Sequence, residues 1–157
     1  MYTILILVFY GLSNFYLPRI IFMKKIVITG ALGYIGMELC KIYSGKSLNY
    51  DVLAIDNKFY SARVNQLNTW NIRFKQLDIL DFKAINQELK DADIVFHLAG
   101  ITDVPTIKSN ESKSINEKIQ NTAIKGTNNV LKSIGDETKL VFPSTHVIFE
   151  GLNNQKK

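Results

Sequence analysis

Short apolar stretches alternate with stretches of helical periodicity along most of the chain. Short apolar, β-branched runs are typical of strands buried on both faces, and helices between them predict a parallel sheet with right-handed crossovers. The predicted strands are 25–29, 52–56, 72–77, 94–98 and 140–142. The predicted helices are 34–44, 81–90 and 112–134, and 57–71 is ambiguous apart from a helical turn at 63–67.

Two residues mark predicted helix ends. Asp81 stands where an N-cap is expected, ahead of Ile85 and Leu89, which share one helical face. Gly135 follows the last helix, and a glycine at this position predicts a C-terminal cap.

The most informative segment is K-I-V-I-T-G-A-L-G-Y-I-G at 25–36, where a strand ends in three glycines spaced three apart. Gly30 allows a tight turn, Gly33 lets a pyrophosphate approach the backbone, and Gly36 lets the following helix pack closely on the strand. The helix N-terminus offers N–H groups and a partial positive charge to phosphates. The alternative is a glycine-rich turn in an ordinary α/β protein.

A second, independent signal is Asp56, which ends the second predicted strand 26 residues after Gly30. A carboxylate about 20 residues after such a turn accepts hydrogen bonds from an adenosine ribose and repels a 2′-phosphate. The two signals together favour dinucleotide binding, with NAD preferred over NADP, over a simple turn aspartate before Asn57. Lys58 and Arg63 lie close in sequence and weaken the preference for NAD.

Composition and charge narrow the class of protein. The chain of 157 residues fits one domain, and its net charge of +5 is spread out, with Arg19, Lys156 and Lys157 near the termini. We therefore expect no nucleic-acid partner. The single cysteine, Cys40, excludes an internal disulfide and suggests no metal cluster; its helical setting predicts burial, and a reducing cytoplasm fits.

Residues 1–22 do not share this pattern. They are mostly apolar but contain Ser13, Asn14, Pro18 and Arg19, so a membrane span is not favoured. We interpret them as an apolar extension, upstream of a natural start at Met23, with a weak membrane anchor as the alternative. The dinucleotide-binding domain is then expected at 23–157.

Several motifs over 24–151 resemble the extended short-chain dehydrogenase/reductase family, which contains NAD-dependent epimerases, dehydratases and reductases of nucleotide sugars. The motifs are T-G-A-L-G-Y-I-G at 29–36, I-D-N at 55–57, L-D-I at 77–79, H-L-A-G at 97–100, K-G-T at 125–127 and P-S-T-H-V-I-F-E-G at 143–151. The resemblance implies a Rossmann-type doubly wound parallel sheet, truncated after about the fifth strand, and hydride transfer to or from nicotinamide. It also implies a nucleotide-sugar substrate and a homodimer in the full-length form.

The resemblance also implies roles for individual residues. Thr145 is the expected catalytic hydroxyl, and no metal ligands are implied. The expected cofactor-binding residues are Gly30, Gly33, Tyr34, Ile35, Gly36, Asp56, Asn57, Asp78, Ile79, Leu98, Ala99, Gly100 and Ser144. Three alternatives stay open: Asp78 as a turn cap, Ser144 and Thr145 as strand-end caps, and His97 as a structural group rather than a base, which we favour.

Two departures from the family pattern bear on activity. Ala123 stands where the family has asparagine, and no tyrosine of the 157 residues is followed by lysine four positions later. A Tyr-x-x-x-Lys pair supplies the acid/base of the family, so we expect this chain alone to be inactive. A non-catalytic NAD-binding module and a decayed reading frame are the alternatives. The motifs do not separate a sugar reductase from a 4-epimerase.

Overall fold

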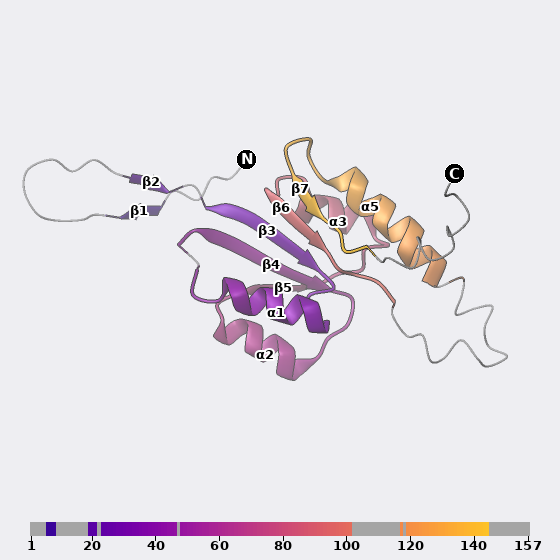
Figure 1. The fold of residues 1–157 in the computed structure, drawn as a ribbon, viewed down its shortest axis with the longest axis horizontal. Coiled ribbons are helices and arrows are strands. Elements are labelled where there is room, and N and C mark those ends of the chain that lie inside the picture. The colour runs from indigo at the N-terminus through magenta and orange to yellow at the C-terminus, as the bar shows by residue number, and fades with distance from the viewer. Residues whose placement is uncertain are drawn as a thin grey trace, which may run out of the picture.

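The computed structural model describes residues 6–8, 19–21, 23–46, 48–101, 117 and 119–144. Within these residues, five parallel strands form one sheet in the order β5-β4-β3-β6-β7 (Figure 1). Their bounds are β3 Lys24–Thr29, β4 Tyr50–Asp56, β5 Arg73–Gln76, β6 Ile94–His97 and β7 Lys139–Val141. All five predicted strands are confirmed, with shifts of one or two residues at their ends. The chain builds outward from β3 to β5 and then returns to place β6 on the other side of β3.

Helices cover both faces of this sheet (Figure 1). Helices α1 (Tyr34–Tyr43) and α2 (Ser61–Thr69) lie on one face, and α3 (Phe82–Leu89) and α5 (Thr127–Ser133) lie on the other. The alternation of side chains along β3 explains this arrangement, because Ile26 and Ile28 pack in the core below α1 and α2 while Val27 packs with α3 and α5. The predicted Rossmann-type doubly wound architecture is confirmed.

The helix ends confirm one prediction and correct another. Asp81 is the N-cap of α3, and its Oδ1 accepts a hydrogen bond from the Ala84 N–H at 3.1 Å. Gly135 is not a left-handed cap: its φ is not positive, and α5 ends at Ser133 with Ile134 extended. The Gly135 N–H instead donates to Thr138 Oγ1, and this hydroxyl donates to Ala92 O, so a side chain terminates the helix.

The structure also differs from the prediction at the ambiguous segment 57–71 and at the longest predicted helix. Helix α2 extends well beyond the predicted turn at 63–67. The predicted helix at 112–134 contains a π-helical turn, η2 (Asn121–Gly126), directly before α5. Most of its first third lies outside the described residues.

Two short strands of the apolar extension pair with each other. Strand β1 (Ile6–Val8) pairs antiparallel with β2 (Arg19–Ile21), and this pair is separate from the five-stranded sheet (Figure 1). Across the described parts of the chain, no helix combines the length and apolar character needed to cross a membrane.

Cys40 is completely buried on α1, as the sequence predicts, and burial raises the pKa of its thiol to about 12. We expect this thiol to react with a thiol reagent at pH 8 at least about a thousandfold more slowly than in the unfolded chain, because reaction requires opening of the core. The rate of reagent colour development with and without denaturant measures this ratio. Rates within tenfold of each other would contradict the packing of α1 described above.

Candidate functional site

The candidate site lies where the winding of the sheet reverses, between β3 and β6. Thr29, the last residue of β3, is in register with His97, the last residue of β6. The glycine turn at 30–36 and the loop at 98–100 therefore leave the sheet side by side at its carboxyl edge. Ligands of open α/β sheets bind in this position.

Gly30 and Gly36 give the turn its shape. Gly30 has a φ of +68°, and a Cβ added there would lie 2.7 Å from the backbone N of Ala99 and the backbone C of Leu98. A Cβ added to Gly36 would lie 2.6 Å from the Cα and the O of Ala31. The predicted tight turn at Gly30 is confirmed. Gly36 was expected to let α1 pack on the strand, but the atoms close to it belong to the turn at Gly30 and Ala31.

Gly33 leaves the N-terminus of α1 open. It is the N-cap residue and has no side chain that could accept hydrogen bonds from the first helical turn. The helical bonds begin with the Met37 N–H donating to Gly33 O at 3.0 Å, so the N–H groups of residues 34–36 have no acceptor within the helix. Gly33, Tyr34 and Ile35 are all exposed. This helix end is able to donate several hydrogen bonds to an anion.

Asp56 joins the tip of β4 to the glycine turn. Its Oδ2 accepts a hydrogen bond from the Leu32 N–H at 3.0 Å, and its Oδ1 accepts one from the Lys58 N–H at 3.0 Å. A carboxylate oxygen has two acceptor sites, so each oxygen can still accept a hydroxyl after these bonds are made. The half-buried side chain is therefore both a support for the turn and a candidate partner for a ribose.

Asn57 and Asp78 connect the tips of β4 and β5. The Asn57 Nδ2 donates to Asp78 Oδ2 at 3.3 Å, and Asp78 Oδ1 accepts from the Leu80 N–H at 2.9 Å. Asp78 thus caps its own turn, and its contact with an adenine stays a prediction. The Ile79 side chain is buried against Gly126, where an added Cβ would lie 2.8 Å from its Cγ1, so Ile79 can offer a ligand only its backbone.

His97 is a completely buried structural group, as we favoured from the sequence. Its Nδ1 lies 2.8 Å from Thr29 Oγ1, its Nε2 lies 3.0 Å from Thr127 Oγ1, and its ring stacks on Phe142 at 5.4 Å between centroids. Burial lowers the pKa of the imidazole. The sequence analysis did not predict Thr29 and Thr127 as the partners of His97. The G-T pair at 126–127 was the one motif that pointed to Thr127.

The remaining predicted residues lie around the same edge. Leu98 donates its N–H to Thr29 O at 3.1 Å, and the Ala99 N–H donates to Thr29 Oγ1 at 3.3 Å. Gly100 and Ser144 are exposed, and Thr145 lies outside the described residues. Among the residues that the structure describes, no three metal-ligating side chains gather at one place.

Comparison with known families agrees with this arrangement. A sequence model described as the 3-beta hydroxysteroid dehydrogenase/isomerase family matches residues 27–156. The chain belongs to this family. The match begins in β3 and includes the glycine turn and the tips of all five strands. It confirms the predicted relationship to the short-chain dehydrogenase/reductases.

Two curated relatives have nucleotide-sugar names. The chain is 31% identical to a UDP-N-acetyl-alpha-D-glucosaminuronate decarboxylase of Bacillus cytotoxicus over 80% of its own length and 38% of the relative's. It is 30% identical to a UDP-glucose 4-epimerase of Rickettsia bellii, over 78% of its own length and 36% of the relative's. The chain thus spans well under half the length of these relatives.

Solved structures share the fold. A UDP-N-acetylglucosamine 4-epimerase from Methanobrevibacter ruminantium, solved in complex with UDP-N-acetylmuramic acid, superposes with a TM-score of 0.63 at 26% identity, over 86% of this chain and 42% of that one. A UDP-glucose 4-epimerase from Stenotrophomonas maltophila, solved with NAD and formylated UDP-arabinopyranose, gives a TM-score of 0.64 at 23% identity, over 80% and 38% of the two chains. This second likeness concerns the fold alone.

Proposed function

We propose that this chain is the NAD-binding part of a nucleotide-sugar epimerase, dehydratase or reductase. The observation that carries the proposal is the open N-terminus of α1 beside the Asp56 carboxylate, at the point where the winding of the sheet reverses. The nucleotide-sugar class is supported by the names of the two curated relatives and of the epimerase from Methanobrevibacter ruminantium.

The residues present fit a dinucleotide. The N–H groups of residues 34–36 would hold the pyrophosphate, with Gly33 leaving its approach free of side-chain atoms. Asp56 would accept the hydroxyls of the adenosine ribose, and Asp78 with the Ile79 backbone would lie beside the adenine. The loop at 98–100 would pass alongside the cofactor, and Ser144 would border it. When bound, NAD supplies the acceptor or donor of a hydride.

The same geometry supports NAD over NADP. The carboxylate of Asp56 would repel a 2′-phosphate, and Arg63, which could have balanced that repulsion, donates a hydrogen bond to the Leu32 carbonyl instead.

Thr145 is the proposed catalytic hydroxyl that orients the substrate oxygen.

A titration of NADH, followed by its fluorescence, tests the proposal. We expect the wild-type chain to bind and Gly33→Val to bind at least about tenfold more weakly, a loss of about 1.4 kcal/mol, because the valine side chain occupies the approach of the pyrophosphate. The Gly33 backbone is extended, at φ −73° and ψ 174°, a conformation that any residue adopts. An added Cβ lies 3.1 Å from Gly30 O, a tight contact that requires a small shift of the turn, so the melting temperature of the variant is measured beside its affinity.

Gly135→Val is the matched control, because a Cβ there would lie 3.6 Å from its nearest neighbours, far from the site, on a backbone without positive φ. We expect it to bind NADH like the wild type. Equal affinity of Gly33→Val and the wild type would remove the pyrophosphate from this turn.

The absence of a Tyr-x-x-x-Lys sequence from the 157 residues supports a second proposal: the chain alone binds the nucleotide without converting a UDP-sugar. A non-catalytic NAD-binding module would behave identically in this form. The two differ in a longer form of the protein, where turnover of a UDP-sugar identifies an enzyme and bound NADH without turnover identifies a module.

A further inference from the structure

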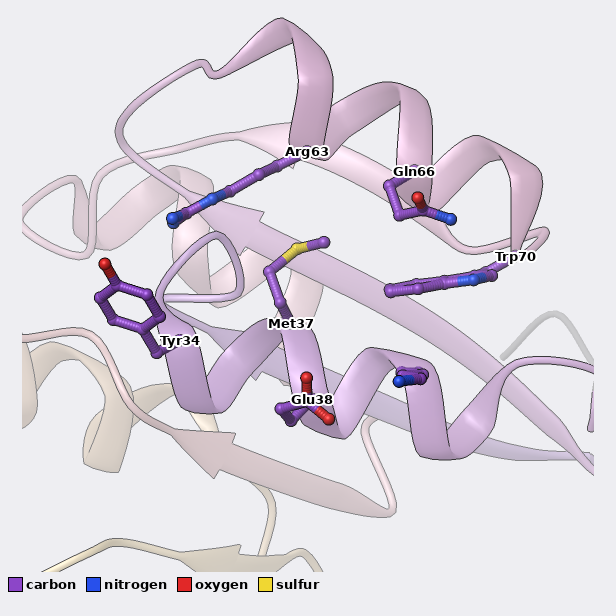
Figure 2. Close-up of a pocket in the computed structure, with 7 residues that line it drawn as sticks. Tyr34, Met37, Glu38, Arg63, Gln66 and Trp70 are labelled. Carbon is purple, nitrogen blue, oxygen red and sulfur yellow. The ribbon is translucent and has the colours of Figure 1, made fainter.

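Arg63 crosses from α2 to the glycine turn. A groove of about 270 Å³ lies between α1 and α2. Figure 2 shows Met37, Glu38, Gln66 and Trp70 along it, with the Arg63 side chain extended toward Tyr34 at one end. The Nη1 of Arg63 donates a hydrogen bond to the Leu32 carbonyl, inside the turn. The groove therefore ends at the segment that precedes the N-terminus of α1.

Two aromatic rings hold the guanidinium in this position. Its central carbon lies 5.4 Å from the centroid of the Tyr34 ring and 5.5 Å from that of the Tyr60 ring. Such cation–π contacts favour one placement of a side chain that otherwise has many rotamers. Tyr34 is the first residue of α1 and Tyr60 is the N-cap of α2, so Arg63 joins the starts of the two helices.

Leu32 is consequently held on both sides of its α-carbon. Its N–H donates to Asp56, its carbonyl accepts from Arg63, and its side chain is 1% exposed. The peptide unit between Leu32 and Gly33 is thereby bonded at both ends, because its N–H, on Gly33, also donates to Gly30 O at 3.0 Å. Without Arg63 that bond alone would hold the peptide, and glycine lacks the Cβ that would restrict its rotation. A rotated peptide would turn a carbonyl oxygen toward the place where an anion must sit.

We propose that Arg63 is a positioning residue for the pyrophosphate-binding turn. It acts through the Leu32 carbonyl, by keeping the peptide before Gly33 in the orientation that leaves the first N–H groups of α1 open. The inference rests on the proposed NAD-binding function. It assigns a role in cofactor binding to a residue that touches neither the adenosine-binding carboxylate nor the N–H groups themselves.

The test compares NADH and adenosine binding by the wild type, Arg63→Ala and Arg73→Ala. Arg73 is the matched control, because its removal makes the same change in charge and breaks only an exposed ion pair with Asp51, at the opposite end of the sheet. We expect Arg63→Ala to bind NADH about tenfold more weakly and Arg73→Ala to bind like the wild type. Adenosine, which has no phosphate, should compete equally well in all three.

Salt separates positioning from a simple charge effect. A charge acting through solvent is screened at high ionic strength, whereas a hydrogen bond to the turn is not. We expect the ratio of NADH affinities, wild type to Arg63→Ala, to be the same at about 50 mM and about 500 mM salt. Arg63→Met, which keeps the aliphatic stem, serves in place of the alanine variant if that variant has a lowered Tm.

Four results are distinguishable: one would overturn the proposed NAD-binding function, and three would overturn only the role of Arg63. If the wild type does not bind NADH, the proposed function itself is wrong. If the wild type binds and the Arg63 variants bind equally well, the inference alone is wrong. The inference is also wrong if adenosine affinity falls together with NADH affinity, which indicates general damage. It is wrong as well if the affinity ratio approaches one at high salt.

Discussion

Gly30→Ala is expected to lower the free energy of unfolding by about 2 to 5 kcal/mol. The φ of +68° at Gly30 costs a residue with a Cβ about 1–2 kcal/mol, and the overpacking adds about 1–3 kcal/mol. The overpacking cannot relax cheaply, because the atoms 2.7 Å from the added Cβ belong to the backbone of Leu98 and Ala99. Both belong to the loop that follows strand β6, next to the central strand β3.

Urea unfolding followed by circular dichroism measures this loss, which would remove a large share of the stability of a typical domain. Gly100→Ala is the control, because an added Cβ at that position meets no atom within 4 Å and its φ is not positive. We expect the control to stay within about 0.5 kcal/mol of the wild type. A Gly30→Ala variant as stable as the control would mean that the turn does not pack on the 98–99 loop.

His97→Phe is expected to cost about 2–4 kcal/mol of unfolding free energy. The new ring is similar in shape and can still stack on Phe142, but it cannot pair with either hydroxyl. Thr127 Oγ1 then loses the imidazole as its partner, and Thr29 Oγ1 keeps only the Ala99 N–H, at a position that is completely buried in the wild type. Leaving a buried polar group unpaired costs about 1–3 kcal/mol.

Thr127→Val supplies the matched comparison, since it removes only one of the two hydroxyls. We expect it to cost less than His97→Phe, and the double variant to show a coupling energy of at least about 0.5 kcal/mol. Additive losses in thermal or urea unfolding would show that the His97–Thr127 contact contributes nothing to stability.

His97 also predicts how stability depends on pH. Burial lowers the pKa of the folded imidazole below its ordinary 6.5, so the unfolded chain binds a proton first as the pH falls. Stability from this group is full above pH 6.5 and decreases between 6.5 and the lowered pKa. His97→Phe should therefore show a smaller loss of stability than the wild type between pH 7 and pH 5. Equal slopes would contradict a buried, neutral His97.

Much of the fold follows from local sequence pattern. The five strands, the Asp81 cap and the burial of Cys40 were predicted because each depends on neighbouring residues and on the period of a strand or a helix. The Gly135 cap was wrong for an equally physical reason. The Gly135 N–H donates to the nearby Thr138 hydroxyl, which a tertiary hydrogen bond to Ala92 O holds in place, and this arrangement competes with the left-handed cap that glycine favours.

The sequence by itself determined the chemistry at the strand tips: three glycines where a backbone must bend, and an aspartate where hydroxyls must be bound. Only the tertiary structure decided which of these groups touch. Thr29 meets His97 across 68 positions of sequence, and Arg63 meets the Leu32 carbonyl across 31. These contacts arise because parallel strands bring their carboxyl ends to one edge, where side-chain packing and hydrogen-bond geometry, rather than spacing along the chain, select the partners.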